Sequence, residues 1–374
     1  MQHHHVKETT RETLERVKSE YSQLVKTTTF SLQELFNSAD FRLEEHCKTY
    51  QPHPGSEQLT KEARAFGEQY GIWLDNAKHY ISCVLFVFPN ATYERMAAMV
   101  KNNAIDYYLN DTMGRDVFCY LSPRQQLNAR HLIYRMSCID ETLDTVDNAH
   151  PLELANAAIL KDIRETSTTE WFTQFLKLYN HHIAVTHKDC NVAGLGFIPS
   201  VDKYIEMRNH TSGMPHIVML VEYSTGVFLD WQWLARIKVV QRMKRMHRAA
   251  ALIGCLMNDL FSFEKEVIDN DSDSNLLMSV AMNNPDMSLS DVIQHSAGIV
   301  RDLLVEYMEL SAQIENKCRQ LPASEAVMVS KLRIHLADLD RSVQASWTWQ
   351  VYTKRFKRFD SIWEETQLAT PVTA

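Results

Sequence analysis

Three oxygen-bearing side chains stand four residues apart in the stretch NDLFSFEKE, residues 258–266: Asn258, Ser262 and Glu266. At about 100° per residue, this spacing places all three on one face of a helix. Carboxylate and amide-type oxygens are hard ligands that suit Mg²⁺. Lys265 lies beside Glu266 and could reach an anion bound to the metal. The pattern indicates a magnesium site, although a polar patch at a solvated helix end would present the same triple.

The same stretch directly follows the apolar run AAALIGCLM, residues 249–257. A helix that continues from this run carries its polar side chains toward the protein interior. A buried polar group costs free energy unless another group pairs with it. Either the helix end is exposed, or something charged lies beside it.

Apolar residues recur at helical spacing through most of the chain. One example is the face formed by Met96, Val100, Ala104, Tyr107 and Asp111, which advances by about 3.6 residues per turn. Strict alternation of apolar and polar residues is rare. The periodicity therefore predicts long helices and an all-α fold.

Composition supports one large helical domain. Hydrophobic residues make up 45% of the 374 positions, which is ample for a core, and 10 Gly and 10 Pro leave little punctuation for short strands. None of the turn-rich breaks is long enough for a domain linker. We expect a polar, partly helical N-terminal extension over 1–60, a single α-helical bundle around a central cavity over 61–366, and a tail over 367–374.

Charge and cysteine usage narrow the class of protein. The net charge of −8 argues against a nucleic-acid partner, because phosphate binding needs a basic face. Seven scattered cysteines without a CxxC pair are typical of reduced thiols. The sequence offers no apolar signal segment and no run that could span a bilayer. We expect a cytoplasmic protein without membrane insertion, and the sequence leaves a homodimer open.

The histidines carry no recognisable metal motif. The His181–His182 pair and the others have no Cys or acid at metal-ligand spacing along the chain. They are interpreted as structural or exposed residues.

The stretch NDLFSFEKE resembles the second metal motif of class I terpene synthases of the microbial type, which is also found in corals. That motif has Asn or Asp, then Ser or Thr, then Glu, with a Lys before the Glu. Residues 258–266 match it at every specified position. Further segments similar to family motifs follow one another in the expected order between Phe88 and Phe356.

The segment FPNATYERMAAMVKNNAIDYYLNDTMGRD, residues 88–116, is similar to the approach to the family's first, aspartate-rich motif. Asp111 and Asp116 correspond to its first and last acids. Thr112 stands where the family usually has a second Asp, and Asn110 with Asp111 is an alternative pair.

A rival first motif is CIDETLDTVD, residues 138–147, with Asp140, Glu141 and Asp144 expected on one helix face. It lies closer to Arg208 than the family layout expects. We therefore keep these acids as the second choice.

Two later segments resemble diphosphate-binding motifs. YIEMRNHTSGMP, residues 204–215, is similar to the pyrophosphate-sensor segment, with Arg208 as the sensor and Gly213 in the helix break that would relay its movement. WTWQVYTKRFKRFD, residues 347–360, is similar to the family's C-terminal Arg-Tyr pair, although Phe356 lacks the hydroxyl of the Tyr. Arginine suits this work because its planar fork binds phosphate in a bidentate manner.

The resemblance implies a role for each matching residue. It implies three Mg²⁺ ions that help an isoprenyl diphosphate to ionise, and aromatic faces that stabilise the carbocation. The implied metal ligands are Asp111, Asp116, Asn258, Ser262 and Glu266; the implied catalytic residues on the diphosphate are Arg208, Lys265 and Arg355; the implied substrate contacts are Tyr107, Tyr108, Gly213, Trp349 and Phe356.

We therefore expect a class I terpene cyclase that acts on geranylgeranyl or farnesyl diphosphate. The motif sequences resemble those of coral diterpene cyclases, and this resemblance favours geranylgeranyl diphosphate. One alternative is a prenyl diphosphate synthase, which would carry a second Asp-rich motif in place of NDLFSFEKE. The other is a catalytically silent helical binding protein, for which Thr112, Asn209 and Phe356 would be the signs of decay.

Overall fold

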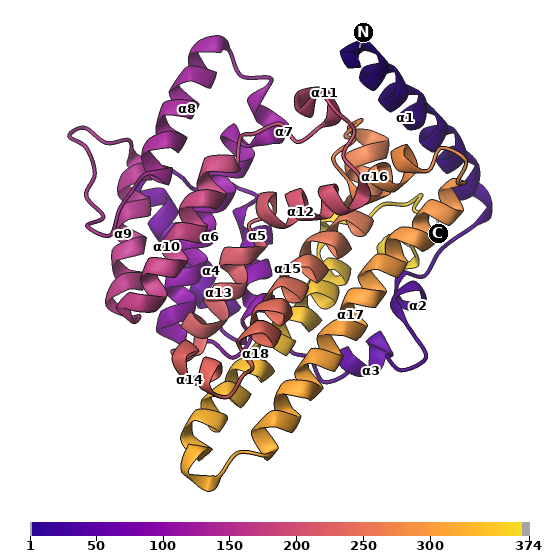
Figure 1. Ribbon diagram of the computed structural model, residues 1–374. Coiled ribbons are helices and arrows are strands. Elements are labelled where there is room, and N and C mark those ends of the chain that lie inside the picture. The colour runs from indigo at the N-terminus through magenta and orange to yellow at the C-terminus, as the bar shows by residue number, and fades with distance from the viewer. Residues whose placement is uncertain (1, 369–374) are drawn as a thin grey trace, which may run out of the picture.

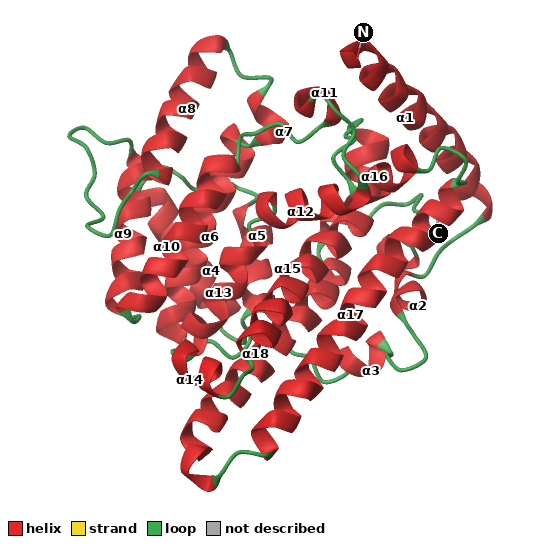
Figure 2. Ribbon diagram, in the orientation of Figure 1, coloured by secondary structure: helices red, strands yellow, loops and turns green. Residues whose placement is uncertain are grey.

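Helices make up most of the molecule. The computed structural model describes residues 2–368, apart from the side chains of 2–5, 78, 79 and 116, and contains no extended strand in that range (Figures 1 and 2). The first half contains α1 (Gln2–Thr27), α2 (Leu32–Phe36), α3 (Leu43–Cys47), α4 (Ser56–Gln69), α5 (Ala77–Val87), α6 (Tyr93–Met113), α7 (Arg115–Phe118), α8 (Pro123–Ser137), α9 (Pro151–Glu165) and α10 (Thr169–Val185).

The second half contains the longest helices. They are α11 (Val192–Leu195), α12 (Val201–Thr211), α13 (Met214–Thr225), α14 (Trp231–Arg236), α15 (Val240–Phe263), α16 (Leu276–Asn283), α17 (Leu289–Arg319) and α18 (Ala326–Tyr352). Short turns of other helix types complete the chain: the π-helix η1 (Glu264–Asp269) and the 3₁₀ turns η2 (Ala323–Glu325), η3 (Lys354–Phe356) and η4 (Glu364–Thr366). The predicted all-α fold is confirmed.

Helix α15 lies at the centre of the bundle, with α12, α13, α16, α17 and α18 packed around it (Figure 1). From Ala249 to Phe263 nearly every residue of this helix is buried. A helix that is apolar on all sides belongs in a core. The run that precedes Asn258 therefore places the start of the candidate motif inside the protein.

Helix α6 forms a second packing centre, in contact with α4, α5, α9 and α13. Met96, Val100 and Ala104 are buried, as the helical periodicity predicts. The same face leads toward Tyr107 and Asp111 near the C-terminal end of the helix. Packing of α6 thus fixes the direction of the first candidate motif.

The N-terminal helix and the C-terminal segment lie together against the bundle. In α1, Val17 and Tyr21 are buried, and the Tyr21 hydroxyl donates to Glu264 Oε1 at 2.9 Å. Ser361 Oγ and the Ile362 amide donate to the same carboxylate at 2.7 and 2.9 Å. These hydrogen bonds to Glu264 therefore hold α1 and the C-terminal segment against η1.

The expected domain division stays a prediction. The boundary at residue 60 falls inside α4, whose helix runs over Ser56–Gln69. Most of the expected tail, residues 369–374, lies outside the described residues. Among residues 2–368, no helix combines the length and apolar character needed to cross a membrane.

Candidate metal and diphosphate site

The second candidate motif spans a change of helix type. Asn258 and Ser262 lie on α15, whereas Glu266 lies on the π-helix η1. The regular spacing predicted one α-helix through all three residues, and this is wrong for the step from Ser262 to Glu266. A π-helical turn bonds i to i+5 and is frequent at functional sites. The wider turn therefore changes the angular position of Glu266 relative to Ser262.

The three oxygen-bearing side chains have few good partners within the protein. Asn258 Oδ1 accepts from Arg208 Nη2 at 3.4 Å, and Asn258 Nδ2 donates to Gln350 Oε1 at 3.3 Å, both long for hydrogen bonds. Ser262 Oγ is buried and makes no well-directed hydrogen bond among the described residues. The Glu266 carboxylate accepts from Asn275 Nδ2 at 3.2 Å.

The surroundings of Glu266 also make its carboxylate harder to ionise than usual. Burial and the neighbouring Asp259 carboxylate raise the pKa of Glu266, whereas Arg208, the Ser262 hydroxyl and Asn275 lower it. A half-buried carboxylate beside a hydroxyl that makes no well-directed hydrogen bond suits a cation with oxygen ligands. The residues present therefore fit a magnesium ion, on the evidence of the Ser262 hydroxyl and this carboxylate.

Asp259, the residue next to Asn258, is fully paired. Its Oδ1 accepts from Arg208 Nε at 2.8 Å, and its Oδ2 accepts from the Tyr204 hydroxyl at 2.5 Å and from the Leu276 amide at 3.1 Å. Asp259 has no exposed surface, and Arg208 is nearly buried. This ion pair fixes the guanidinium of Arg208 beside Asn258. The role of Asp259 is not visible in the sequence, because its partner Arg208 is 51 residues away.

Asp111 lies at the end of α6 facing α5. Its Oδ2 accepts from Asn76 Nδ2 at 2.9 Å and from the Tyr80 hydroxyl at 3.1 Å, and its Oδ1 accepts from Asn110 Nδ2 at 2.9 Å. Asn76 and Tyr80 were not predicted, because they lie on another helix. The backbone of Asp116 lies in α7, and its side chain is outside the described residues.

Aromatic and basic side chains gather around Tyr80. The Tyr107 ring stacks on it with centroids 3.5 Å apart, and the Arg355 guanidinium carbon lies 5.8 Å from its centroid. Arg355 Nε is buried without a hydrogen-bond partner among the described residues. Tyr108 is partly buried against the main core. Asp111, Tyr107 and Arg355 therefore all lie around the Tyr80 side chain.

The C-terminal end of α18 and the turn after it connect the residues near Asn258 with those around Tyr80. Gln350, in the last turn of this helix, contacts Asn258, and Arg355 follows it in η3. Helix α18 packs against both α5 and α15. Gln350 and Arg355 thus link the residues of α15 to those around Tyr80 near the end of α6.

Other expected site residues have mixed surroundings. Trp349 is buried with Tyr50 and Phe86 and donates from Nε1 to Ser82 Oγ at 3.0 Å, so its described contacts hold α18 against α5. Phe356 is buried, with its ring centroid 6.3 Å from that of Phe261. Lys265 is exposed on η1.

The expected helix break lies between α12 and α13. Gly213 has a φ of 76°, in the left-handed region that favours glycine. A Cβ atom there would come within 2.9 Å of the His182 ring and 3.1 Å of the His216 ring. Both backbone and packing therefore require glycine at this break.

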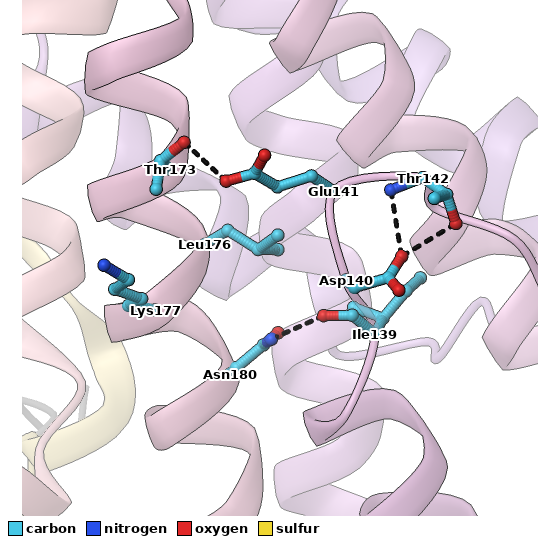
Figure 3. A pocket seen from close by; sticks show the side chains of 8 residues that line it. All are labelled: Ile139, Asp140, Glu141, Thr142, Thr173, Leu176, Lys177 and Asn180. Carbon is cyan, nitrogen blue, oxygen red and sulfur yellow. Dashed lines mark hydrogen bonds between the residues drawn. The ribbon is translucent and has the colours of Figure 1, made fainter.

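The rival acidic segment lies elsewhere (Figure 3). Helix α8 ends at Ser137, so the expectation that these acids share a helix face is wrong. Asp140 accepts from the Thr142 amide and hydroxyl at 2.9 and 2.7 Å, and Glu141 accepts from Thr173 Oγ1 at 2.6 Å. They border an open surface hollow of about 430 Å³. Each of the two carboxylates is hydrogen-bonded by a different threonine hydroxyl.

Comparison with known proteins identifies the family of the chain. Residues 108–306 match the family model described as terpene synthase family 2, C-terminal metal binding. The fold and the motif order define a class I terpene synthase of the microbial type. The chain belongs to terpene synthase family 2. The match includes Asp111, Arg208 and the whole of residues 258–266, and the family description supports a metal cofactor.

Individual relatives are distant but cover most of the chain. The 10-epi-cubebol synthase of Sorangium cellulosum is 21% identical over 317 residues, which is 83% of this chain and 96% of that protein. The (2Z,6E)-hedycaryol synthase of Kitasatospora setae is 22% identical over 305 residues, 77% of this chain and 82% of that protein. The crystal structure of α-eudesmol synthase shares the fold, with a TM-score of 0.67 at 16% identity, covering 81% of this chain and 97% of that one.

Proposed function

We propose that this terpene synthase is a Mg²⁺-dependent cyclase that ionises a linear isoprenyl diphosphate and folds the resulting carbocation into a cyclic terpene. The observation that carries the proposal is the set of weakly paired oxygens on Asn258, Ser262 and Glu266 beside a fixed arginine. Such a set in the interior is costly unless it binds a cation. Three ions, as the family resemblance implies, would be held by these residues together with Asp111 and Asp116.

When bound, magnesium supplies Lewis-acid stabilisation of the negative charge that grows on the departing diphosphate. Arg208 is positioned for the same task. Its Nε is engaged by Asp259, whereas Nη2 makes only a long contact with Asn258. We propose that the remaining N–H groups donate to the diphosphate, with Lys265 and Arg355 as further cationic partners.

Tyr107 is the aromatic residue best placed to face a carbocation. It stacks on Tyr80 in the group that holds Asp111 and Arg355. An aromatic face stabilises a desolvated cation by about 2 kcal/mol. Tyr108 and Phe356 are proposed to line the same cavity, whereas the contacts of Trp349 with Ser82 favour a supporting role. Gly213 would transmit movement of Arg208 across the helix break.

Farnesyl diphosphate is the substrate to test first. A relative from Streptomyces viridochromogenes, 23% identical over 210 residues, is named 7-epi-α-eudesmol synthase with (2E,6E)-farnesyl diphosphate as the cyclised substrate; the match spans 56% of this chain and 59% of that protein. The resemblance to coral diterpene cyclases makes geranylgeranyl diphosphate the second candidate. A cytoplasmic location and a homodimer stay predictions.

The test is product analysis with purified protein and Mg²⁺. Geranyl, farnesyl and geranylgeranyl diphosphate are incubated separately, and extracts are analysed by gas chromatography with mass detection. A cyclic product from one substrate, absent with EDTA and with Asn258→Ala, supports the proposal and gives the chain length. Linear alcohols alone would mean ionisation without a template for ring closure. No turnover of any substrate would favour a silent binding protein.

A further inference from the structure

A second cluster of potential metal ligands lies where α6, α10 and α13 meet. Asp106 comes from α6, His182 from α10 and His216 from α13, and one ligand atom from each lies within 4.8 Å of the others. His216 Nε2 lies 3.6 Å from Asp106 Oδ2. The two imidazole centroids are 4.7 Å apart.

The polar atoms of this cluster are almost all without hydrogen-bond partners. His182 Nδ1, both ring nitrogens of His216 and Asp106 Oδ1 are buried and make no well-directed hydrogen bond among the described residues, and His216 Nε2 has only its 3.6 Å contact with Asp106 Oδ2. Leaving a buried polar group without a hydrogen bond costs free energy. These three side chains, with ligand atoms within 4.8 Å of one another, therefore make a candidate metal site.

We propose that Asp106, His182 and His216 form a second metal site, which binds a divalent transition ion such as Zn²⁺ or Co²⁺. Imidazole nitrogen favours these ions, whereas Mg²⁺ prefers oxygen ligands. In a tetrahedral zinc site the ligand atoms lie about 3.4 Å apart. The 3.6 Å between His216 and Asp106 is already close to this, so only His182 has to approach. The site is independent of the proposed cyclase activity.

Packing holds the two histidines in place. The Tyr179 and Phe175 rings meet His216 edge to face at 5.6 and 6.3 Å. Gly213 leaves the space that both histidine rings occupy, because a Cβ there would collide with His182. The cluster therefore borders the helix break, and a bound ion would connect α10 to it.

This cluster cannot be recognised from the sequence. The interpretation of the histidines as structural or exposed rested on spacing along the chain, whereas Asp106, His182 and His216 are far apart in sequence. Only the packing of three helices brings them together.

The test titrates Co²⁺ into metal-stripped, full-length protein in excess Mg²⁺, with His3, His4 and His5 replaced by Ser in every sample to remove an adventitious site. Visible d–d absorption and calorimetry report binding. We expect about one equivalent of Co²⁺, displaced by Zn²⁺. Binding should weaken at least about tenfold in His182→Gln and in His216→Gln.

Two controls separate this site from other metal ligands. His181→Gln removes one ring of the exposed His181–His210 pair, and Glu266→Gln removes a ligand of the proposed magnesium site; both should bind Co²⁺ as the parent does. His182→Cys should retain Co²⁺ and add a thiolate charge-transfer band, which a variant that merely misfolds would not show. Absence of Co²⁺ binding to the parent, or equal binding by parent, His182→Gln and His216→Gln, would overturn the proposal.

Discussion

Two sets of polar side chains share the nine residues of NDLFSFEKE, and the protein treats them differently. Asp259 and Glu264 each accept three hydrogen bonds from well-placed donors of the chain. Asn258, Ser262 and Glu266 have long contacts or, for the Ser262 hydroxyl, none that is well directed. Asp259 and Glu264, the paired set, stabilise the helix in its position. Asn258, Ser262 and Glu266, called the unpaired set because their contacts are long or poorly directed, are left available for ligands.

This difference explains how a buried helix can carry so many polar groups. Asp259 faces α12 and the start of α16, where Tyr204, Arg208 and the Leu276 amide meet it. Glu264 faces the chain termini through Tyr21 and Ser361. The paired acids fix the direction of α15 and η1, and that direction presents the unpaired oxygens to the same region as Arg208.

The largest effect is expected from breaking the paired set. Asp259→Ala leaves the Arg208 guanidinium buried without its counter-charge, which should lower the free energy of unfolding by about 3–5 kcal/mol. Urea denaturation followed by circular dichroism measures this. The double variant Arg208→Met with Asp259→Leu should regain most of the loss, because it removes both charges. A loss below about 1 kcal/mol in the single variant would contradict the scaffold role.

The unpaired set should respond in the opposite way. Asn258→Ala should slow turnover at least about 100-fold, since even outer-shell partners of metals are worth 10–100-fold. Its free energy of unfolding should change by less than about 1 kcal/mol, because only two long contacts are lost. Asn258→Asp keeps an oxygen ligand and is the matched control, which should retain most of the activity. Equal stability losses in Asn258→Ala and Asp259→Ala would remove the distinction.

Glu222 is a buried acid outside the motif, and its pKa is set by burial and by one backbone hydrogen bond. Glu222 accepts from the Leu229 amide at 2.8 Å, and burial raises its pKa to about 7. The folded state therefore holds a proton that the unfolded chain loses near pH 4.5, so this contribution to stability is lost as the pH rises from 4.5 to 7.

Glu222→Gln should remove that pH dependence. Relative to the parent, the variant should gain about 2–3 kcal/mol in free energy of unfolding between pH 4.5 and pH 7. Urea unfolding of both proteins across this pH range measures the gain. Parallel curves for the two proteins would show that Glu222 ionises as easily in the folded state as in the unfolded chain.

The smallest effect on stability is expected at Ser262. Removing a buried hydroxyl without a well-directed partner should leave the free energy of unfolding unchanged or raise it by about 1 kcal/mol. Ser262→Ala should nevertheless need more Mg²⁺ for half-maximal diphosphate release. Ser279→Ala removes another buried hydroxyl without a partner and is the matched control, with no change in the Mg²⁺ requirement. A marked loss of stability in Ser262→Ala would place this residue in the paired set.

The sequence singled out the unpaired set and gave no role to the paired one. Asn258, Ser262 and Glu266 share a regular spacing that is visible in the sequence, although the step from Ser262 to Glu266 passes from an α-helix to a π-helix. Their role as metal ligands stays a prediction. Asp259 depends on Arg208 and Glu264 on Ser361, and such partners become visible only when distant helices pack. The π-helix at Glu264 has no marker in composition or periodicity.

The same limit applies to the first motif. The face of α6 from Met96 to Asp111 follows from periodicity, whereas Asn76 and Tyr80 reach Asp111 from α5. Asp140 and Glu141 resembled a metal pair on one helix face in sequence, but the helix ends before them, and they accept hydrogen bonds from the hydroxyls of Thr142 and Thr173. Helix ends and cross-helix partners are therefore what the sequence could not supply.

The most direct test measures diphosphate release from farnesyl and geranylgeranyl diphosphate by the parent and by Glu266→Gln, over a range of Mg²⁺ concentrations. Urea unfolding confirms beforehand that the variant is folded. We predict Mg²⁺-dependent release by the parent from at least one substrate, and release at least about 100-fold slower by the folded variant. Equal rates for the two proteins would contradict the claim that the unpaired oxygens of residues 258–266 bind the catalytic metal.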